Sequence, residues 1–209
     1  MPLLLDRLLP HRRRWVVELG FGKGRFLLEQ ARQRPGDGFV GVEVASRYFR
    51  LAARRAARRG LDNVLLLRGE ALYLLCTHLP RAFADEVHVY FPDPWPKSRH
   101  HKRRLFDAES VDLLLGLLRC GGSLYFATDH AEYGDEVEAL LREHPGVEVR
   151  GPFAAWPDGP RTNYEIKYAR EGRQIRRLVV RLRAGARSLL HPAGRRDLLM
   201  GPRVSAAER

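Results

Sequence analysis

The feature that most constrains this 209-residue chain is a regular alternation of short apolar segments with helical patterns. The apolar segments have the length of buried strands and lie at residues 15–19, 39–44, 64–68, 87–91 and 123–128. The helical patterns lie at residues 25–34, 47–59, 71–78, 105–119 and 132–143. Strands that alternate with helices form a parallel sheet with helices on both faces. We therefore expect an α/β, doubly wound, Rossmann-like fold.

The pattern changes near the C-terminus. A short strand at 147–150, a loop rich in proline and glycine, a helix at 162–171 and a strand at 175–182 would complete a seven-stranded sheet. Beyond this point the chain is rich in arginine, glycine and proline and has no periodicity. The sequence thus predicts one domain over residues 1–183 and a basic tail over 184–209, whose order the composition does not define.

The composition indicates a partner with many negative charges. Hydrophobic residues make up 44% of the chain, as in a globular domain, while the net charge is +12 and the pI is about 10.5. A basic surface attracts phosphate chains whatever their sequence. The apolar start, Leu3 to Leu5, is too short for a signal sequence or membrane span, so we expect a cytoplasmic protein without a membrane partner. A monomer and a homodimer both remain open.

The two cysteines give no sign of a metal or redox site. Cys76 and Cys120 lie far apart in the sequence and match no ligand spacing, so we expect buried thiols in a reducing compartment. The adjacent residues His100 and His101 cannot both face one ion from a helix, and they have no acidic partner at ligand spacing. No metal is expected.

A glycine-rich segment connects the first strand to the first helix. It contains Glu18, Gly20, Gly22 and Gly24, and glycines at such a turn let a ligand approach the backbone closely. The G-x-G-x-G spacing is one residue shorter than the dinucleotide fingerprint, which disfavours a nicotinamide cofactor. A tight strand-to-helix turn without a ligand remains the alternative.

Two further acids lie at the carboxyl ends of the next two strands. Glu43 ends the second strand, where its carboxylate could accept hydrogen bonds from the ribose hydroxyls of a nucleoside, and Glu70 follows the third. Either acid alone would more often be a solvated surface residue. Together with the glycine-rich segment, they predict a pocket for S-adenosylmethionine along three consecutive strand ends.

The fourth strand ends in a proline-rich loop, Phe91-Pro92-Asp93-Pro94-Trp95-Pro96-Lys97. Its three prolines stop the strand, since each lacks an N–H and has a fixed φ. A basic run follows, which comprises Arg99, His100, His101, Lys102, Arg103 and Arg104. A carboxylate, an indole and positive charges thus meet at the sheet edge where open α/β sheets bind ligands. The alternative is a solvated loop with a basic helix start.

Two polar clusters near the other strand ends have helix-capping spacing. Asp129 with Glu132, and Thr162 with Glu165, both match a capping box, and Asn163 and Tyr164 lie inside the second. Capping and ligand contact are compatible, because a helix that begins at this edge of the sheet faces the binding cleft.

These segments, in this order, closely resemble the tRNA (guanine-N7)-methyltransferases of the TrmB type. The similar segments are Glu18 to Gly24, Gly41 to Val44, Phe91 to Lys97, Arg99 to Arg104, Thr128-Asp129 and Thr162-x-x-Glu165, and the match covers about residues 15–182. The resemblance implies the class I S-adenosylmethionine-dependent methyltransferase fold. It also implies methyl transfer to N7 of the guanine at tRNA position 46, in the variable loop.

The resemblance implies roles for single residues as well. The cofactor side would comprise Glu18, Gly20, Gly22, Gly24, Glu43, Glu70 and Asp93, with Asp93 also catalytic. The tRNA side would comprise Lys97, Arg99, His100, Lys102, Arg103, Arg104, Asp129, Thr162, Asn163, Tyr164 and Glu165. Glu70 stands where family members usually have Asp or Asn. No family role extends to the tail.

Two other functions stay open on the residues alone. Pro-Asp-Pro-Trp loosely resembles an Asn-Pro-Pro-aromatic turn that binds exocyclic amines, so an RNA methyltransferase acting on an amino group is one alternative. A non-catalytic RNA-binding module on the same fold is the other, and the basic surface alone would favour it. Measured affinity for S-adenosylmethionine separates the module from the enzymes.

Overall fold

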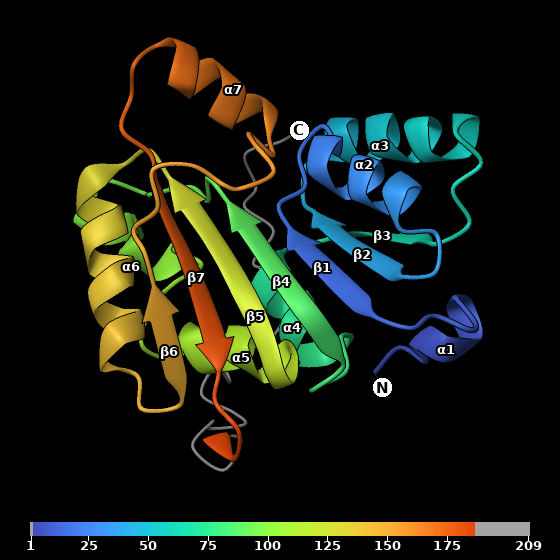
Figure 1. Cartoon of the computed structure of the whole chain (residues 1–209), viewed down its shortest axis with the longest axis horizontal. Helices are drawn as coiled ribbons and strands as arrows, with labels where there is room; N and C mark the ends of the chain where they lie inside the picture. The colour runs from blue at the N-terminus through green and yellow to red at the C-terminus, as the bar shows by residue number, and fades with distance from the viewer. Residues whose placement is uncertain (1, 187–209) are drawn as a thin grey trace.

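A computed structural model describes residues 2–186, and residues 1 and 187–209 lie outside this description. Most of the predicted tail, 184–209, therefore lies outside the described residues. The described chain forms one central sheet with helices on both faces (Figure 1). No helix in this part of the chain is long and apolar enough to cross a bilayer.

The sheet has seven strands in the order β3-β2-β1-β4-β5-β7-β6. Their bounds are β1 Trp15–Leu19, β2 Gly38–Glu43, β3 Val64–Arg68, β4 Ala84–Tyr90, β5 Leu118–Thr128, β6 Val147–Arg150 and β7 Arg176–Leu182. Strands β1 to β5 are parallel, while β7 runs antiparallel to both of its neighbours, β5 and β6. The strand order reverses between β1 and β4, so the carboxyl ends of these two strands form the switch point at which such sheets bind ligands.

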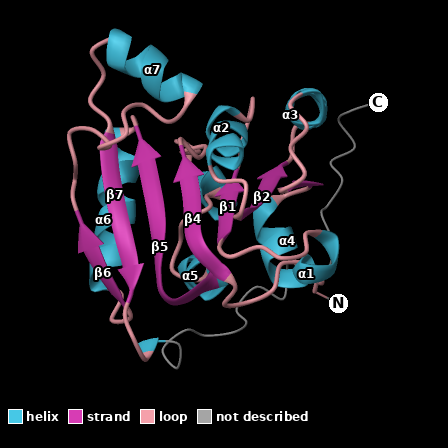
Figure 2. Cartoon of the chain, turned by 45° about the vertical axis from the view of Figure 1, so that its right-hand side comes forward, coloured by secondary structure: helices cyan, strands magenta, loops and turns pink. Residues whose placement is uncertain are grey.

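The helices form two layers. Their bounds are α1 Leu5–Leu8, α2 Arg25–Gln33, α3 Ser46–Arg58, α4 Ala71–Thr77, α5 Ser110–Leu117, α6 Ala131–Glu143 and α7 Asn163–Arg170, with a 3-10 helix, η1, at Ser98–Arg103. One core cluster packs α2 and α3 against Val16 and Phe39, and a larger one packs α4, α5 and α6 on the other face. Figure 2 shows α7 beyond the carboxyl ends of β4 and β5. The sheet edge between α2 and α7 is therefore where a ligand would bind.

The seven predicted strands are confirmed, but the predicted helix at 105–119 is wrong at both ends. Its N-terminal part is not helical, because the Asp107 carboxylate accepts a hydrogen bond from the backbone of Ser110 over 2.7 Å and closes a turn there. At the other end the backbone becomes extended at Leu118, which pairs with Ala84 and begins β5. Apolar periodicity could not separate the end of a buried helix from the start of a buried strand.

The prediction of two buried thiols is also wrong. Cys120 is exposed, in the first part of β5, and Cys76 is half-buried, in α4. Both cysteines lie in regular secondary structure, where the packing of neighbouring elements determines which side chains are buried.

Candidate functional site

A cavity of about 680 Å³ lies at the carboxyl edge of the sheet, at the switch point. Its wall comes from the segments that follow β1, β2, β3 and β4 and from the start of α7. The predicted cofactor residues Glu18, Gly20, Gly22, Glu43, Glu70 and Asp93 all line it. The structure therefore brings together residues as far apart in the sequence as Glu18 and Asp93, which are separated by 75 positions.

The glycine-rich segment needs glycine for its backbone conformation. Gly20, Gly22 and Gly24 have φ values of +75°, +54° and +72°, in the left-handed region that other residues rarely adopt. A Cβ at Gly20 or Gly22 would meet nothing within 4 Å, whereas one at Gly24 would lie 3.1 Å from the Cβ of Ala52. The space above Gly20 and Gly22 is thus open to a ligand, and Gly24 serves the packing of α2 against α3.

Glu18 is a buried acid in the cavity lining. Its side chain is 3% exposed, and Oε2 accepts a hydrogen bond from the backbone N–H of Leu27 over 3.1 Å. Burial raises the pKa of Glu18 to about 8; the Leu27 N–H acts against this shift and the charge of Glu43 adds to it. At neutral pH the carboxyl group is mainly protonated, and a positively charged ligand beside it would favour ionisation.

Glu43 holds two parts of the wall together. Its Oε2 accepts from the N–H of Gly22 and its Oε1 from the N–H of Ala45, both over 2.8 Å. The carboxylate therefore connects the glycine-rich segment to the start of α3. Each oxygen has a further lone pair, so Glu43 can accept ligand hydroxyls without giving up these bonds.

Glu70 has a capping role in addition to the predicted one. It is the N-cap residue of α4, and its carboxylate accepts from the N–H groups of Leu72 over 3.1 Å and Tyr73 over 2.7 Å. The side chain is exposed and lines the cavity. These two hydrogen bonds fix the direction of the Glu70 carboxylate at the N-terminus of α4.

The proline-rich loop contains two strained aromatic residues. Phe91 and Trp95 have φ values of +52° and +42°, a region that bulky side chains seldom adopt and that costs about 1–3 kcal/mol per residue. The N–H of Phe91 donates to the Ala127 carbonyl over 2.7 Å, and the Phe91 ring packs 5.5 Å from that of Tyr168. These contacts hold the loop in a conformation that its sequence alone would avoid.

Asp93 lies exposed on the cavity wall in the middle of this loop. It is close to Tyr164 at the start of α7: burial raises the pKa of Tyr164, and the negative charge of Asp93 acts in the same direction. Asp93 and Tyr164 thus lie close together in the cavity lining, with the proline-rich loop beside the start of α7.

The basic run forms η1 and the residue after it. The Arg103 guanidinium lies 5.1 Å from the ring centroid of Trp95, and both residues line the cavity. The His100 ring meets Trp95 edge-on at 5.7 Å. Lys97 and Arg99 are exposed outside the cavity lining. Lys97, Arg99 and Arg103 can therefore all reach a phosphate chain at the surface.

Arg104 contradicts the prediction of a phosphate contact. It is 5% exposed, and its Nε donates to the carbonyl of Pro94 over 2.7 Å. Its guanidinium pairs with Glu136 and lies over the ring of Tyr133 at 4.9 Å. Because one residue of a charge run can turn inward, Arg104 ties the proline-rich loop to α6 instead of facing RNA.

Asp129 lies outside the cavity lining, and its predicted capping role is wrong. Its Oδ2 pairs with Arg173 over 2.8 Å. Helix α6 is capped by the next residue, His130, whose Nδ1 accepts from the N–H of Tyr133 over 3.2 Å. The local signal was right about the helix start but wrong about the residue that caps it.

The predicted cap at Thr162 is confirmed. Its Oγ1 accepts from the N–H of Glu165 over 3.0 Å, and Glu165 Oε2 accepts from the N–H of Arg161 over 2.8 Å. Glu165 is 1% exposed and pairs with Arg177 over 2.6 Å, so it fixes the start of α7 from inside. Thr162, Asn163 and Tyr164 line the cavity, whereas Glu165 does not.

Sequence reasoning missed several residues of the wall. Tyr48 in the first turn of α3, Tyr90 at the end of β4, and Lys167 in α7 also line the cavity. Tyr90 could have been found, because it directly precedes the proline-rich loop. Tyr48 carries no signal beyond its place near the start of α3, and Lys167, in the last turn of α7, carries none.

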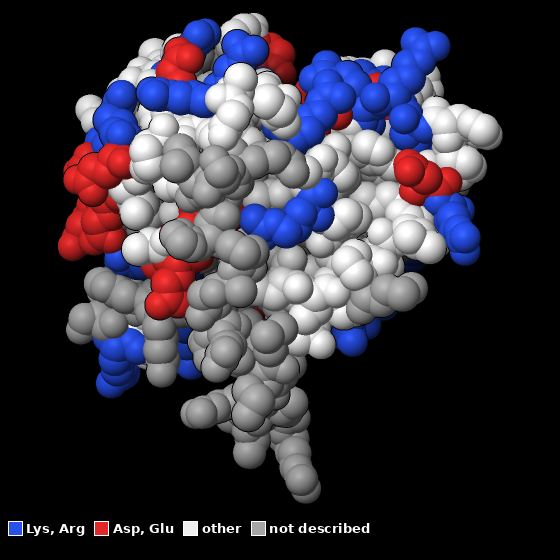
Figure 3. Space-filling model, turned by 90° about the horizontal axis from the view of Figure 1, so that it is seen from below, with Lys and Arg blue, Asp and Glu red and all other residues white. Residues whose placement is uncertain are grey.

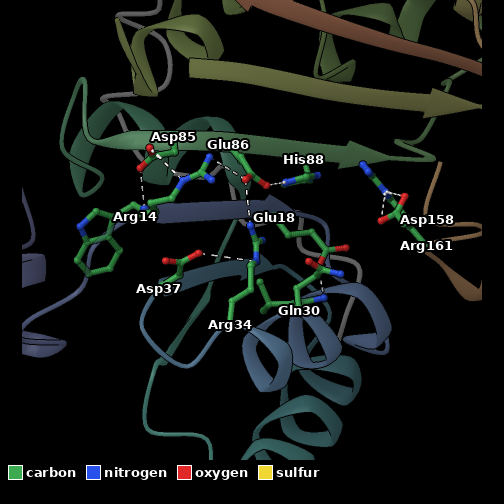
Figure 4. A network of polar contacts seen from close by, with 12 residues as sticks. Arg14, Glu18, Gln30, Arg34, Asp37, Asp85, Glu86, His88, Asp158 and Arg161 are labelled. Carbon is green, nitrogen blue, oxygen red and sulfur yellow. Dashed lines mark hydrogen bonds and ion pairs between the residues drawn. The ribbon is translucent and has the colours of Figure 1, made fainter. Parts of the chain in front are cut away.

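A buried polar network supports the wall from behind (Figure 4). His88 bonds through Nδ1 to the Tyr90 hydroxyl over 2.7 Å and through Nε2 to Glu86 over 3.1 Å, and Arg161 donates to the same hydroxyl over 2.8 Å. Burial lowers the pKa of His88 to about 4, against the effect of Glu86, so the ring is neutral at pH 7. A neutral ring donates through Nε2 to Glu86 and accepts at Nδ1 from the Tyr90 hydroxyl. Each of these hydrogen bonds then has one donor and one acceptor.

Comparisons with known proteins identify relatives along most of the chain. A family model described as "Putative methyltransferase" matches residues 12–178. The chain is 36% identical over 174 residues to a tRNA (guanine-N(7)-)-methyltransferase of Nitrosococcus oceani, across 83% of this chain and 74% of that protein. A protein of the same name from Alkalilimnicola ehrlichii is 37% identical across 87% of this chain and 78% of its own length.

Two solved structures share the fold. The 16S rRNA methyltransferase KamB matches with a TM-score of 0.62 and 18% identity, across 86% of this chain and 92% of its own. The antibiotic-resistance methyltransferase Kmr matches with a TM-score of 0.57 and 24% identity, across 85% and 91%. The seven-stranded sheet with an antiparallel β7 is the class I S-adenosylmethionine-dependent methyltransferase fold.

Proposed function

The chain belongs to the tRNA (guanine-N7)-methyltransferase family, and on that premise we propose that it transfers a methyl group from S-adenosylmethionine to N7 of a guanine in tRNA. One observation carries the proposal. A single cavity is lined both by the acids at the strand ends and by Asp93, Trp95 and Arg103 of the loop and basic run. A cofactor and a polyanionic substrate can therefore meet in it.

The residues present suit S-adenosylmethionine. The cavity of about 680 Å³ falls within the range of about 300–1,000 Å³ typical of small-molecule sites. The open space above Gly20 and Gly22 admits a ligand against the backbone, Glu43 can accept from ribose hydroxyls, and Glu70 would lie toward the adenine. Glu18 offers a buried carboxyl group to a positive charge. The bound cofactor would supply an electrophilic methyl group on a sulfonium.

For the guanine, alignment of N7 with the methyl group matters more than acid-base catalysis. Guanine N7 has a lone pair and no proton, so no general base has to activate it. As the N7 lone pair forms the new N–C bond, the bond between methyl and sulfur would break, its electron pair would stay on the sulfur of the leaving S-adenosylhomocysteine, and the positive charge would pass to the purine. We propose that Asp93 orients the base and that its carboxylate stabilises this charge, an electrostatic effect that acts most strongly in the transition state. Thr162, Asn163 and Tyr164 would hold the other side of the base.

The exposed cations beside the cavity suit the RNA backbone. Lys97, Arg99 and Arg103 would bind phosphates next to the guanine and so fix its position without reading the sequence. We propose the variable-loop guanine as the target, and a cytoplasmic location with tRNA as the partner. Asp129, paired with Arg173, would act on the substrate only if that ion pair opens.

The test is product identification. The protein is incubated with methyl-labelled S-adenosylmethionine and a tRNA transcript, and the nucleosides are separated after digestion. We expect 7-methylguanosine from the parent transcript and none from a transcript whose variable-loop guanine is replaced by adenine. Label on an exocyclic amino group, or cofactor-independent RNA binding without any transfer, would contradict the proposal and support one of the two alternative functions.

A further inference from the structure

The exposed face of α3 carries a row of four arginines. Arg47, Arg50, Arg54 and Arg58 are all exposed, and their spacing of three and four residues places them on one side of the helix. At 1.5 Å per residue the row is about 16 Å long. The opposite face of α3 packs against the sheet through Ala52 and its neighbours.

No carboxylate of the described residues neutralises the charge of this row. Arg47 donates to the hydroxyl of Tyr48 over 2.5 Å and Arg50 to Oγ of Ser46 over 2.6 Å, both uncharged groups. Helix α3 itself contains no acidic residue. In residues 2–186 no ion pair joins a carboxylate to any of the four arginines. Like charges three and four positions apart repel one another along a helix, so the row weakens α3 in the free protein.

The row starts at the cavity. Ala45 and Tyr48, at the start of α3, line the cavity wall. Arg47 lies close enough to Tyr164, across the cavity, for its positive charge to oppose the rise in the pKa of Tyr164 that burial causes. Viewed from below, the largest group of Lys and Arg lies at the upper right and the largest group of Asp and Glu lies at the left, where Lys and Arg also occur (Figure 3).

We propose that the arginine row of α3 is a second RNA-backbone site, which binds phosphates of the same tRNA whose guanine enters the cavity. This inference rests on the proposed function. The exposed cations of the basic run follow β4 and the arginine row follows β2, so the bound RNA would be held from two segments of the cavity rim. Guanidinium groups bind phosphates through paired hydrogen bonds, and such contacts determine position more than sequence preference.

The test variant is Arg50→Gln with Arg54→Gln. Neither residue lines the cavity, and glutamine is nearly as good a helix former as arginine. The matched control is Arg181→Gln with Arg183→Gln, which removes the same charge from exposed positions at the far end of antiparallel β7. The affinity of each protein for a tRNA transcript is measured at several salt concentrations, together with the affinity for S-adenosylmethionine and the thermal midpoint.

We expect Arg50→Gln with Arg54→Gln to weaken tRNA binding about tenfold at low salt and to flatten the plot of log affinity against log salt by about one to two units. Cofactor affinity and single-turnover rate at saturating tRNA should equal those of the parent, and the thermal midpoint should stay equal or rise. An unchanged slope in this variant, or an equal loss in the control, would overturn the proposal. Absence of 7-methylguanosine in parent reactions would instead reject the proposed function.

Discussion

The guanidinium of Arg161 donates a hydrogen bond over 2.8 Å to the hydroxyl of Tyr90, the last residue of β4. Arg161 also lies 4.5 Å from the ring centroid of Trp156 and 5.0 Å from that of Tyr125. Tyr90 directly precedes the proline-rich loop, and Arg161 directly precedes Thr162. This contact therefore fixes two parts of the cavity wall relative to each other.

The first prediction concerns this contact. Tyr90→Phe removes the hydroxyl and leaves the buried groups of His88 and Arg161 without that partner, so we expect the free energy of unfolding to fall by about 1–3 kcal/mol. Urea unfolding measures the change. Tyr164→Phe is the control, because its side chain is half exposed and its loss should stay within about 0.5 kcal/mol. Equal stability of Tyr90→Phe and the parent would show that the network contributes nothing.

The second prediction concerns the pH dependence of cofactor binding. The pKa of Glu18 is about 8 in the free protein, and a cationic ligand favours the ionised form. Below pH 8 binding of the cofactor therefore releases a proton. Its affinity should rise with pH by at most about tenfold per pH unit and should level off above pH 8. Calorimetry in buffers of different ionisation enthalpy measures the proton release. Glu18→Gln should abolish the release.

The same pKa makes a prediction about stability. Folding raises the pKa of Glu18 from 4.5 to about 8, so the folded state binds this proton more tightly than the unfolded state. Its contribution to stability is complete below pH 4.5 and is lost as pH rises toward 8. Ligand-free Glu18→Gln, which does not titrate, should therefore gain thermal stability relative to the parent between these pH values. A constant difference across this range would contradict the burial argument.

The third prediction concerns Glu43. Glu43→Ala removes the proposed acceptor of the ribose hydroxyls and also releases the N–H groups of Gly22 and Ala45, so we expect cofactor binding to weaken by about 1–3 kcal/mol. Calorimetry measures the affinity, and circular dichroism checks that the fold is kept. Equal affinity in variant and parent would remove Glu43 from the cofactor site.

The fourth prediction separates two neighbouring arginines. Arg104→Ala removes a buried side chain that binds Pro94 and Glu136, so it should lower the free energy of unfolding by about 1–3 kcal/mol. Arg103→Ala should leave stability almost unchanged and instead flatten the salt dependence of tRNA binding by about one unit. The reverse pattern would show that Arg104 faces the RNA and Arg103 supports the loop.

The sequence could predict which strand-end residues line the cavity, because the signals for them are local. Parallel strands end at one edge of a sheet, so Glu18 and Glu43, at the ends of predicted strands, and Asp93, just after one, had to converge. The direction of a side chain within a charge run is not local. Arg104 turns inward because Glu136, 32 positions later, and the Tyr133 ring lie there.

The contacts behind the site were beyond sequence reasoning for a similar reason. Arg161 and Tyr90 are 71 positions apart, and Arg161 lies in a loop whose proline and glycine content gives no periodicity. The early start of β5 at Leu118 likewise depends on its partner Ala84 in β4. Such pairings follow from tertiary packing, which overrides local patterns.

The central claim is that the carboxylate of Asp93 assists methyl transfer, and single-turnover kinetics of Asp93→Asn test it most directly. The variant keeps the shape of the side chain and removes its charge. We expect the rate at saturating tRNA and cofactor to fall by about 10²-fold or more. Lys97→Ala, the comparison variant, should mainly weaken apparent tRNA affinity, because it removes the proposed phosphate contact. A nearly full single-turnover rate in Asp93→Asn, with only weaker cofactor binding, would contradict the account and show that the loop acts only in binding the cofactor.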